Sequence, residues 1–96
     1  MENVETFANV WDALADTPSE AANLQARAEL IFLIANIIRE KGWKQADAAE
    51  RCGVTQPRIN DLLRGRVSRF SLDALVNIIS ALGLRVRFGI EELKAA

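Results

Sequence analysis

Arginine is concentrated in one short part of this chain. Residues 51–69 contain five arginines, and Asp61 is the one acidic side chain among them. The arginines are Arg51, Arg58, Arg64, Arg66 and Arg69. A guanidinium group binds phosphate oxygens through parallel N–H donors, so this concentration indicates contact with a phosphate backbone. A solvated loop and helix face has a similar composition, and charge alone leaves both interpretations open.

The charge of the whole chain hides this concentration. The chain has 12 basic and 13 acidic side chains and a pI near 5.4, whereas DNA-binding domains are usually basic. Residues 1–36 contain six acidic side chains and one basic, a net charge of −5. Residues 37–96 contain eleven basic side chains and seven acidic, a net charge of +4. The chain is therefore dipolar, and its acidic N-terminal part suits a basic protein partner.

Several kinds of chemistry are excluded by the composition. The chain contains no histidine and a single cysteine, Cys52. An internal disulfide is therefore impossible, and there is no Cys/His cluster for a metal site or for acid–base catalysis. The sequence also has no nucleophile–base pair and no glycine-rich phosphate loop. We expect a non-enzymatic protein with no catalytic residues, no metal and no cofactor.

The sequence predicts neither an export signal nor a membrane segment. The N-terminal stretch MENVETFANV is acidic and lacks the basic and apolar regions of a signal peptide. The longest strictly apolar run covers residues 30–35, far below the ~20 residues that cross a bilayer. We expect a cytoplasmic protein with no membrane partner.

Apolar spacing predicts helices through most of the chain. The 96 residues, of which 50% are hydrophobic, are enough for one domain with a compact core. The N-terminal part carries an apolar stripe at helical spacing, which predicts a short amphipathic helix. The stripe consists of Phe7, Val10, Trp11 and Leu14.

The second helix is predicted to be long. Thr17 can cap it, Pro18 suits its first position, and Glu20 completes a capping box. Gly42 then ends the helix after Lys41. Its apolar residues cover more than the roughly 100° arc of a one-sided helix, so a second face must be covered. The N-terminal helix, a second copy of the chain and a different protein are the candidates.

Beyond the long helix, the spacing predicts two short helices joined by a tight turn. The first is expected over residues 45–51, and the turn over 52–54 uses the backbone freedom of Gly53. Thr55 caps the second helix, which tolerates Pro57 in its first turn. This is the helix-turn-helix arrangement, whose second helix enters the major groove of DNA. Its inward side chains are Val54, Ile59, Leu62 and Leu63.

The outward face of the second short helix carries groups that can read DNA. At about 100° per residue, Gln56, Asn60 and Arg64 lie on one side, away from the apolar residues. Gln56, near the helix N-terminus, can pair with adenine through two hydrogen bonds. Pro57 offers only apolar contact, for example with a thymine methyl group.

Asp61 lies beside this face and permits two interpretations. Its carboxylate can accept a hydrogen bond from the amino group of a cytosine. Alternatively, it can form an ion pair with Arg58 or Arg64, each three residues away. The ion pair is the favoured interpretation.

Two stretches together resemble a known family. The sequence TQPRINDLLRGR followed by FSLDALVNIISALG resembles the Xre, or Cro/CI-like, helix-turn-helix family. The preceding FANVWDALADTPSEAANLQARAEL resembles one subgroup, the HigA-like antitoxins of type II toxin–antitoxin systems. With the helix spacing, the resemblance predicts an all-α five-helix bundle of the lambda-repressor type. We expect a helical extension over 1–17, a DNA-binding domain over 18–84, and a strand and tail over 85–96.

The resemblance also implies roles for individual residues. Gln45 begins the first motif helix, where the family holds a phosphate. Gln56, Pro57 and Asp61 occupy the positions that read bases, and Thr55 caps the helix beside them. These roles belong to the family and are expectations for this chain.

Basic residues after the second motif helix complete the implied interface. Arg64 and Arg66 are expected to meet the DNA backbone, and Arg69 is expected to approach the minor groove. The chain departs from the family at Lys44, where Ser or Thr is usual, and at Cys52, where Leu is usual. The complete predicted DNA-contacting set is Gln45, Thr55, Gln56, Pro57, Arg58, Asn60, Asp61, Arg64, Arg66 and Arg69.

The C-terminal part is predicted to close the core and to assemble the protein. Ser71 caps a last helix that ends at Gly83. In residues 84–90, every second residue is apolar and Arg85 and Arg87 lie between them, which predicts a β-strand. A lone strand needs a partner, so we expect it to pair with a second copy in a homodimer. The predicted dimer contacts are Val86, Phe88 and Ile90.

Such a dimer has a consequence for the DNA that it binds. Its two recognition helices would lie about 34 Å apart, one turn of DNA, and would bind a palindromic operator. The alternative is an irregular tail in which Arg85 and Arg87 are solvated.

These observations predict a sequence-specific transcriptional repressor, and the resemblance implies that it is also an antitoxin. In that role it autoregulates its operon and neutralises a RelE/HigB-like ribonuclease toxin, which would bind Phe7, Val10, Trp11 and Leu14. The alternative for this stripe is packing on the long helix. The alternative functions are a stand-alone prophage-type Xre regulator without a toxin partner, and a helix-turn-helix module that binds only proteins.

Overall fold

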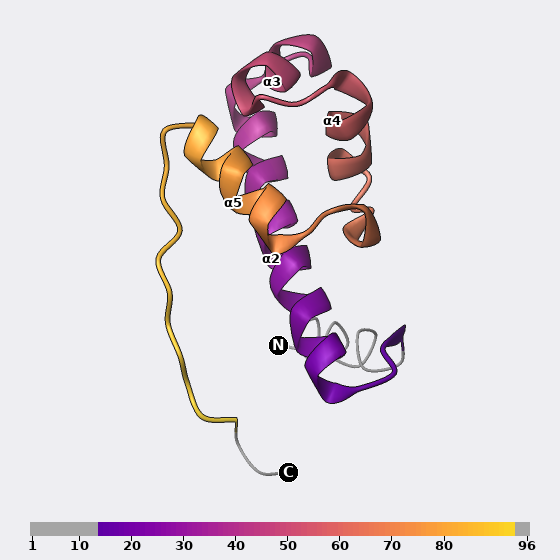
Figure 1. The fold of residues 1–96 in the computed structure, drawn as a ribbon. Helices are drawn as coiled ribbons and strands as arrows, with labels where there is room; N and C mark the ends of the chain where they lie inside the picture. The colour runs from indigo at the N-terminus through magenta and orange to yellow at the C-terminus, as the bar shows by residue number, and fades with distance from the viewer. Residues whose placement is uncertain (1–13, 94–96) are drawn as a thin grey trace.

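The computed structural model describes residues 14–93 as a bundle of helices arranged around one long helix. The long helix α2 runs the length of the bundle, with α3 and α4 near its C-terminal end and α5 alongside it (Figure 1). A 3-10 turn, η1, joins α4 to α5. The elements are α2 (Pro18–Lys41), α3 (Gln45–Cys52), α4 (Gln56–Leu63), η1 (Val67–Arg69) and α5 (Leu72–Ala81).

The prediction of five helices and a C-terminal strand is wrong. Between residues 14 and 93 the structure has four α-helices and no strand. Residues 84–93 are extended and run away from the end of α5 (Figure 1). A strand is held by hydrogen bonds to a neighbouring strand, which the alternation of side chains alone does not supply. Because Arg85 and Arg87 are exposed, the alternative of an irregular tail describes this segment.

The predicted N-terminal helix falls outside the described residues, and so do Phe7, Val10 and Trp11. Leu14, the last residue of that apolar stripe, is described and is exposed. The contact between this stripe and a toxin therefore stays a prediction.

The helix boundaries follow the capping residues of the sequence. Thr17, Thr55 and Ser71 each accept a hydrogen bond from the backbone N–H three residues ahead, at 3.1, 3.4 and 3.1 Å. Gly42 ends α2 in the left-handed region, with φ of 68°. Lys44 caps α3 without a side-chain hydrogen bond, as its departure from the usual Ser or Thr implies.

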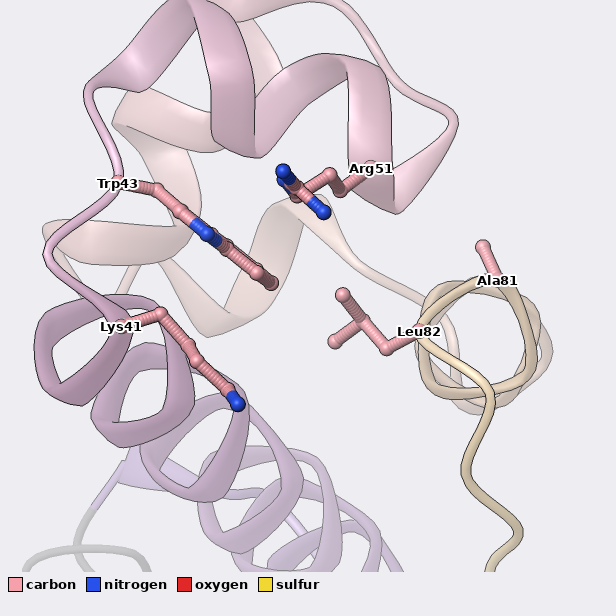
Figure 2. A pocket seen from close by; sticks show the side chains of 5 residues that line it. All are labelled: Lys41, Trp43, Arg51, Ala81 and Leu82. Carbon is pink, nitrogen blue, oxygen red and sulfur yellow. The ribbon is translucent and has the colours of Figure 1, made fainter.

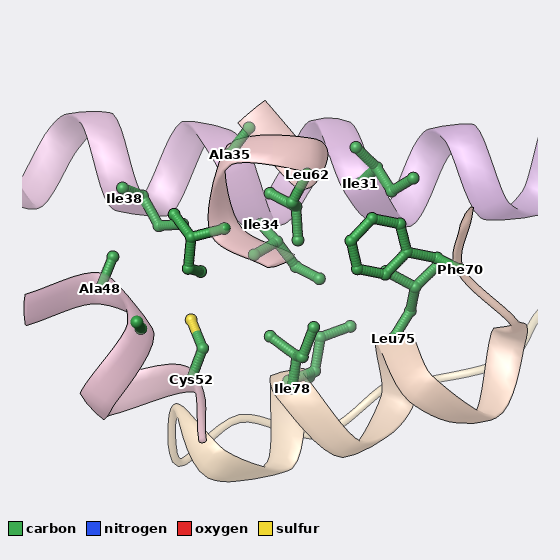
Figure 3. Packing of buried hydrophobic residues seen from close by; sticks show 13 residues of the cluster. Ile31, Ile34, Ala35, Ile38, Ala48, Cys52, Leu62, Phe70, Leu75 and Ile78 are labelled. Carbon is green, nitrogen blue, oxygen red and sulfur yellow. The ribbon is translucent and has the colours of Figure 1, made fainter. Parts of the chain in front are cut away.

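One core cluster joins all four helices. Ile34 of α2 and Leu75 of α5 are fully buried (Figure 3), and so is Ile59 of α4. The buried face of α3 contributes two small alanines. The small side chains allow α3 to lie close to the neighbouring helices. The buried cluster is Ile31, Ile34, Ala35, Ile38, Ala48, Ala49, Cys52, Ile59, Leu62, Phe70, Leu75, Ile78 and Ile79.

The long helix also has an exposed apolar face. Phe32 and Leu33 are 63% and 54% exposed, although both lie in the middle of α2. By length and composition alone α2 is also apolar enough to cross a membrane, but its opposite face packs in the core of this domain. The sequence predicted that a second apolar face of α2 must be covered by another element or protein. Within the described residues this face is exposed, because nothing packs over Phe32 and Leu33.

Cys52 serves as an apolar core residue. Its side chain is 2% exposed, and burial raises the pKa of the thiol above its ordinary value of 9.0. The thiol therefore stays protonated at neutral pH and lacks the nucleophilic thiolate form.

Candidate nucleic-acid interface

The second and third described helices form the predicted helix-turn-helix unit. Gly53 ends α3 in the left-handed region, with φ of 71°, and the Val54 N–H donates to the Ala49 carbonyl at 3.0 Å. Thr55 then begins α4 with its side-chain cap. The turn therefore sets α4 against α3 (Figure 1).

The apolar residues and the N-terminal end of α4 lie as the helical wheel predicts, whereas Asp61, which was predicted beside the outward face, is buried. Ile59 and Leu62 are buried in the core, whereas Gln56 and Pro57 at the N-terminal end are exposed. Asn60, one turn further on, is half-buried. The exposed N-terminal end of α4 is thus available to the edges of bases in a major groove.

Two further residues that were predicted to contact phosphates are exposed. Gln45, the first residue of α3, is exposed. Arg64, at the C-terminal end of α4, is also exposed, and no ion pair to it is found within residues 14–93. Both side chains are therefore open to a phosphate backbone.

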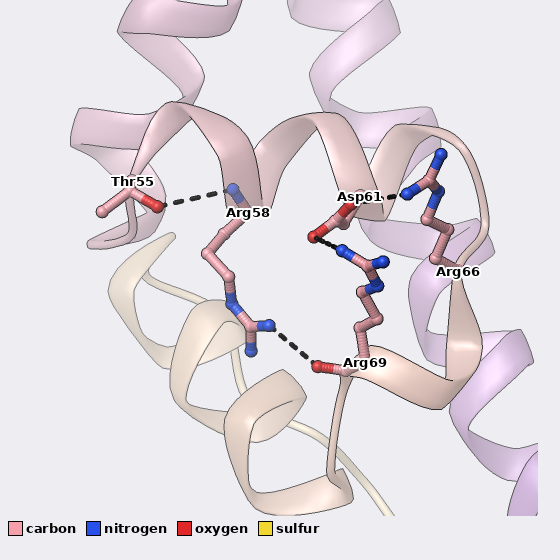
Figure 4. A network of polar contacts seen from close by, with 5 residues as sticks. All are labelled: Thr55, Arg58, Asp61, Arg66 and Arg69. Atoms are coloured by element: carbon pink, nitrogen blue, oxygen red, sulfur yellow. Dashed lines mark hydrogen bonds and ion pairs between the residues drawn. The ribbon is translucent and has the colours of Figure 1, made fainter.

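Arg58 is engaged within the protein. Its guanidinium lies 4.4 Å from the centre of the Phe70 ring. Its Nη1 donates to the Arg69 carbonyl at 2.8 Å (Figure 4). These two contacts join α4 to the C-terminal end of η1. Arg58 holds this segment in the structure, and its predicted contact with DNA stays a prediction.

Asp61 makes the ion pairs that were the favoured interpretation, although with different arginines. Its carboxylate is 3.6 Å from Nη1 of Arg66 and 3.4 Å from Nη1 of Arg69 (Figure 4). Asp61 is 8% exposed, whereas the two arginine side chains are 40% and 55% exposed. The carboxylate therefore faces the protein, and its partners face solvent.

Arg27 is a positioning residue that the sequence reasoning missed. From α2, its Nη1 donates to the carbonyls of Val67 and Phe70, at 3.2 and 3.1 Å. Its Nε donates to Asn23 at 2.7 Å, which fixes the side chain along the helix. One feature of the sequence could have drawn attention to Arg27: it is the one basic residue among residues 1–36. It holds the loop that carries Arg66 and Arg69.

Arg51 lies apart from the other predicted arginines. Its guanidinium is 4.7 Å from the centre of the Trp43 ring. The two side chains line a shallow pocket together with Lys41, Ala81 and Leu82 (Figure 2). Residues of α2, α3 and α5 line this pocket, so Arg51 belongs to that corner of the bundle and not to the open face of α4.

The arrangement is suited to binding DNA. The exposed N-terminal end of α4 presents the amide of Gln56 and the ring of Pro57. Beyond its C-terminal end lie the exposed or half-exposed guanidinium groups of Arg64, Arg66 and Arg69. Amides pair with base edges, and guanidinium groups pair with phosphates. The structure offers no cluster of potential metal ligands within residues 14–93.

Comparisons with known proteins agree with this geometry. Residues 13–91 match the model of a helix-turn-helix domain family. The chain is also similar to a solved structure whose name assigns it to the XRE family of transcriptional regulators. The TM-score is 0.71 at 28% sequence identity, over 80% of this chain and 90% of that chain. Among curated proteins, none matches the sequence significantly.

The match to the family model covers most of the chain and therefore identifies the protein family. It confirms the predicted helix-turn-helix unit and the expectation of a non-enzymatic protein, and the structural match agrees with the Xre resemblance. Neither match identifies the HigA-like subgroup. The chain belongs to the helix-turn-helix domain family, whose members act as DNA-binding regulators.

Proposed function

We propose that this protein is a sequence-specific transcriptional repressor that inserts α4 into the major groove of its own promoter. The observation that carries the proposal is the exposed N-terminal end of α4, with Gln56 and Pro57 outward and Ile59 and Leu62 in the core. A recognition helix meets base edges with this end. A cytoplasmic location follows from the proposed action on DNA.

The predicted contact residues divide into three groups. Gln56, Pro57 and Asn60 face the bases. The backbone is held by Gln45, Arg64, Arg66 and Arg69, which are exposed or half-buried. Thr55, Arg58 and Asp61 position these groups, because each is engaged in a cap, a ring contact or an ion pair.

Two substitutions separate base reading from backbone binding. We expect Gln56→Ala to weaken binding to the promoter by roughly 1 to 3 kcal/mol and to relax its sequence preference. Arg64→Ala should weaken binding to all duplexes alike and lower the salt slope by about one. Gel shifts on the promoter and on a scrambled duplex, at several salt concentrations, measure both effects. Binding that is indifferent to both substitutions contradicts the placement of α4 in the groove.

We further propose a homodimer. Its support is the row of large apolar side chains on the C-terminal segment, where Phe88 and Ile90 are 86% and 100% exposed. Val86 is half-buried against the core and anchors the start of this row. Exposed apolar side chains in a contiguous row mark a protein contact. A second copy related by a two-fold axis would present two recognition helices to a palindromic operator.

The finer proposal is that the repressor is an antitoxin for a RelE/HigB-like ribonuclease toxin. It is supported by the net charge of −5 over residues 1–36, which suits a basic partner, and by the resemblance to HigA-like proteins. The toxin would bind the N-terminal stripe that includes Phe7, Trp11 and the exposed Leu14. A stand-alone regulator is the second candidate, because the family that residues 13–91 match is described as a helix-turn-helix domain, which is sufficient for a DNA-binding regulator.

Co-expression with the product of the neighbouring gene separates these two candidates. An antitoxin should co-purify with a small basic protein encoded next to it, and Trp11→Ala should weaken that complex without changing promoter binding. A chain that represses its promoter and co-purifies with no neighbouring product supports the stand-alone regulator.

A further inference from the structure

Asp61 is the one buried charged residue between residues 14 and 93, and both of its oxygens are occupied. Oδ1 is 3.6 Å from Nη1 of Arg66, and Oδ2 is 3.4 Å from Nη1 of Arg69. A buried carboxylate needs such partners, because an unpaired charge in the interior is unfavourable. Both arginines follow α4 in the chain, and the single Asp61 carboxylate forms ion pairs with both of them (Figure 4).

The loop itself is held from two sides. Arg58 of α4 donates to the Arg69 carbonyl, and Arg27 of α2 donates to the carbonyls of Val67 and Phe70. These hydrogen bonds to the backbone around Arg69 do not involve the Asp61 carboxylate, and the Asp61 backbone carbonyl accepts from the Arg66 N–H at 3.0 Å. The carboxylate acts on the charged ends of the arginines and not on the course of the chain.

We infer that Asp61 is a positioning residue that lowers the affinity of Arg66 and Arg69 for arbitrary DNA and directs them to phosphates of a correctly docked site. The inference rests on the proposed function. Each guanidinium has five N–H donors, so it can bind a phosphate while one donor remains on Asp61. The three side chains together carry a net charge of +1 in place of the +2 of two free arginines.

This arrangement affects specific and non-specific binding differently. Binding to arbitrary DNA depends almost entirely on the number of phosphates that basic groups neutralise. The carboxylate cancels part of that attraction wherever the protein lies on the duplex. At the operator, α4 fixes the register, and guanidinium groups that are already oriented lose less conformational freedom on binding. Asp61 therefore raises the ratio of specific to non-specific affinity.

The test replaces the carboxylate with an amide of the same shape and uses a short duplex of scrambled sequence as the probe. Asp61→Asn in the full chain should tighten binding to this duplex about eightfold at 0.1 M salt. The plot of log K against log salt should steepen by about 0.9, as for one additional neutralised phosphate. A substitution that only loosens the fold would weaken binding, so the gain distinguishes positioning from support.

Glu29→Gln is the matched control. Glu29 is an exposed carboxylate on α2 that makes no ion pair within the described residues, and its replacement changes the net charge by the same amount. It should leave the salt slope unchanged. An Asp61→Asn chain that is folded by circular dichroism and binds the duplex no more tightly than Glu29→Gln overturns the inference.

A second comparison does not depend on the folding of Asp61→Asn. Arg64→Gln removes an exposed guanidinium without an ion pair in residues 14–93, whereas Arg69→Gln removes one that Asp61 holds. The salt slope should fall by about one for Arg64→Gln and by clearly less for Arg69→Gln. Equal losses overturn the inference. A wild-type chain that binds no duplex at any salt concentration overturns the proposed function itself.

Discussion

Replacing Phe70 with alanine is expected to lower the free energy of unfolding by about 3 to 5 kcal/mol. Phe70 is 2% exposed and belongs to the core cluster between α2 and α5 (Figure 3). Its ring also supports the Arg58 guanidinium at 4.4 Å. Alanine would leave a cavity in the core and remove the surface on which that guanidinium lies. Because domains of this size are marginally stable, the loss is a large fraction of the total.

Urea denaturation followed by circular dichroism measures this change as a shift of the midpoint. Phe32→Ala is the matched control, because Phe32 is 63% exposed on α2 and leaves no cavity when it is shortened. We expect the control to change stability by about 0.5 kcal/mol or less. Similar shifts for the two variants would show that Phe70 is not part of the core.

The helix starts and the buried faces of the helices were predictable from the sequence, because they depend on local patterns of residues. Thr17, Thr55 and Ser71 cap helices as the sequence indicates, since an N-cap needs only its own side chain and the next turn. The inward face of α4 was also predictable from helical periodicity, and Ile59 and Leu62 are buried as expected.

The partners of Asp61 were not predictable from the same rules. The expected pairing with Arg64 assumes that α4 continues past this residue, and the expected pairing with Arg58 assumes that its side chain has no other partner. The helix instead ends at Leu63, and Gly65, with φ of 70°, turns the chain back. This turn brings Arg66 and Arg69 to the carboxylate, whereas Arg58 is drawn to Phe70.

Contacts between residues far apart in the chain could not be predicted from the sequence either. Arg27 binds carbonyls 40 and 43 residues away, and no spacing rule connects them. The C-terminal strand failed for a similar reason. Alternation over residues 84–90 shows which side chains share a face, but a strand exists only where a neighbouring chain supplies hydrogen bonds.

Charged substitutions on the C-terminal segment are expected to have the largest effect on DNA binding. Phe88→Asp together with Ile90→Asp should convert the proposed dimer to a monomer and weaken operator binding about 10²- to 10⁴-fold. The physical reason is that a dimer places its second recognition helix on the operator at a high effective concentration, which a monomer loses. Both side chains are almost fully exposed in the described chain, so the substitutions leave the monomer core intact.

Sedimentation and operator gel shifts with the same samples measure the two effects together. Phe32→Asp with Leu33→Asp places the same charges on the other exposed apolar surface, on α2, and is the control. If the C-terminal segment forms the dimer, this control keeps the dimer mass and the operator affinity. If only the Phe32→Asp, Leu33→Asp variant loses the dimer, the dimer interface lies on α2 and not on the C-terminal segment. A chain that sediments as a monomer without any substitution contradicts the dimer, and it would then have to bind its operator through one recognition helix.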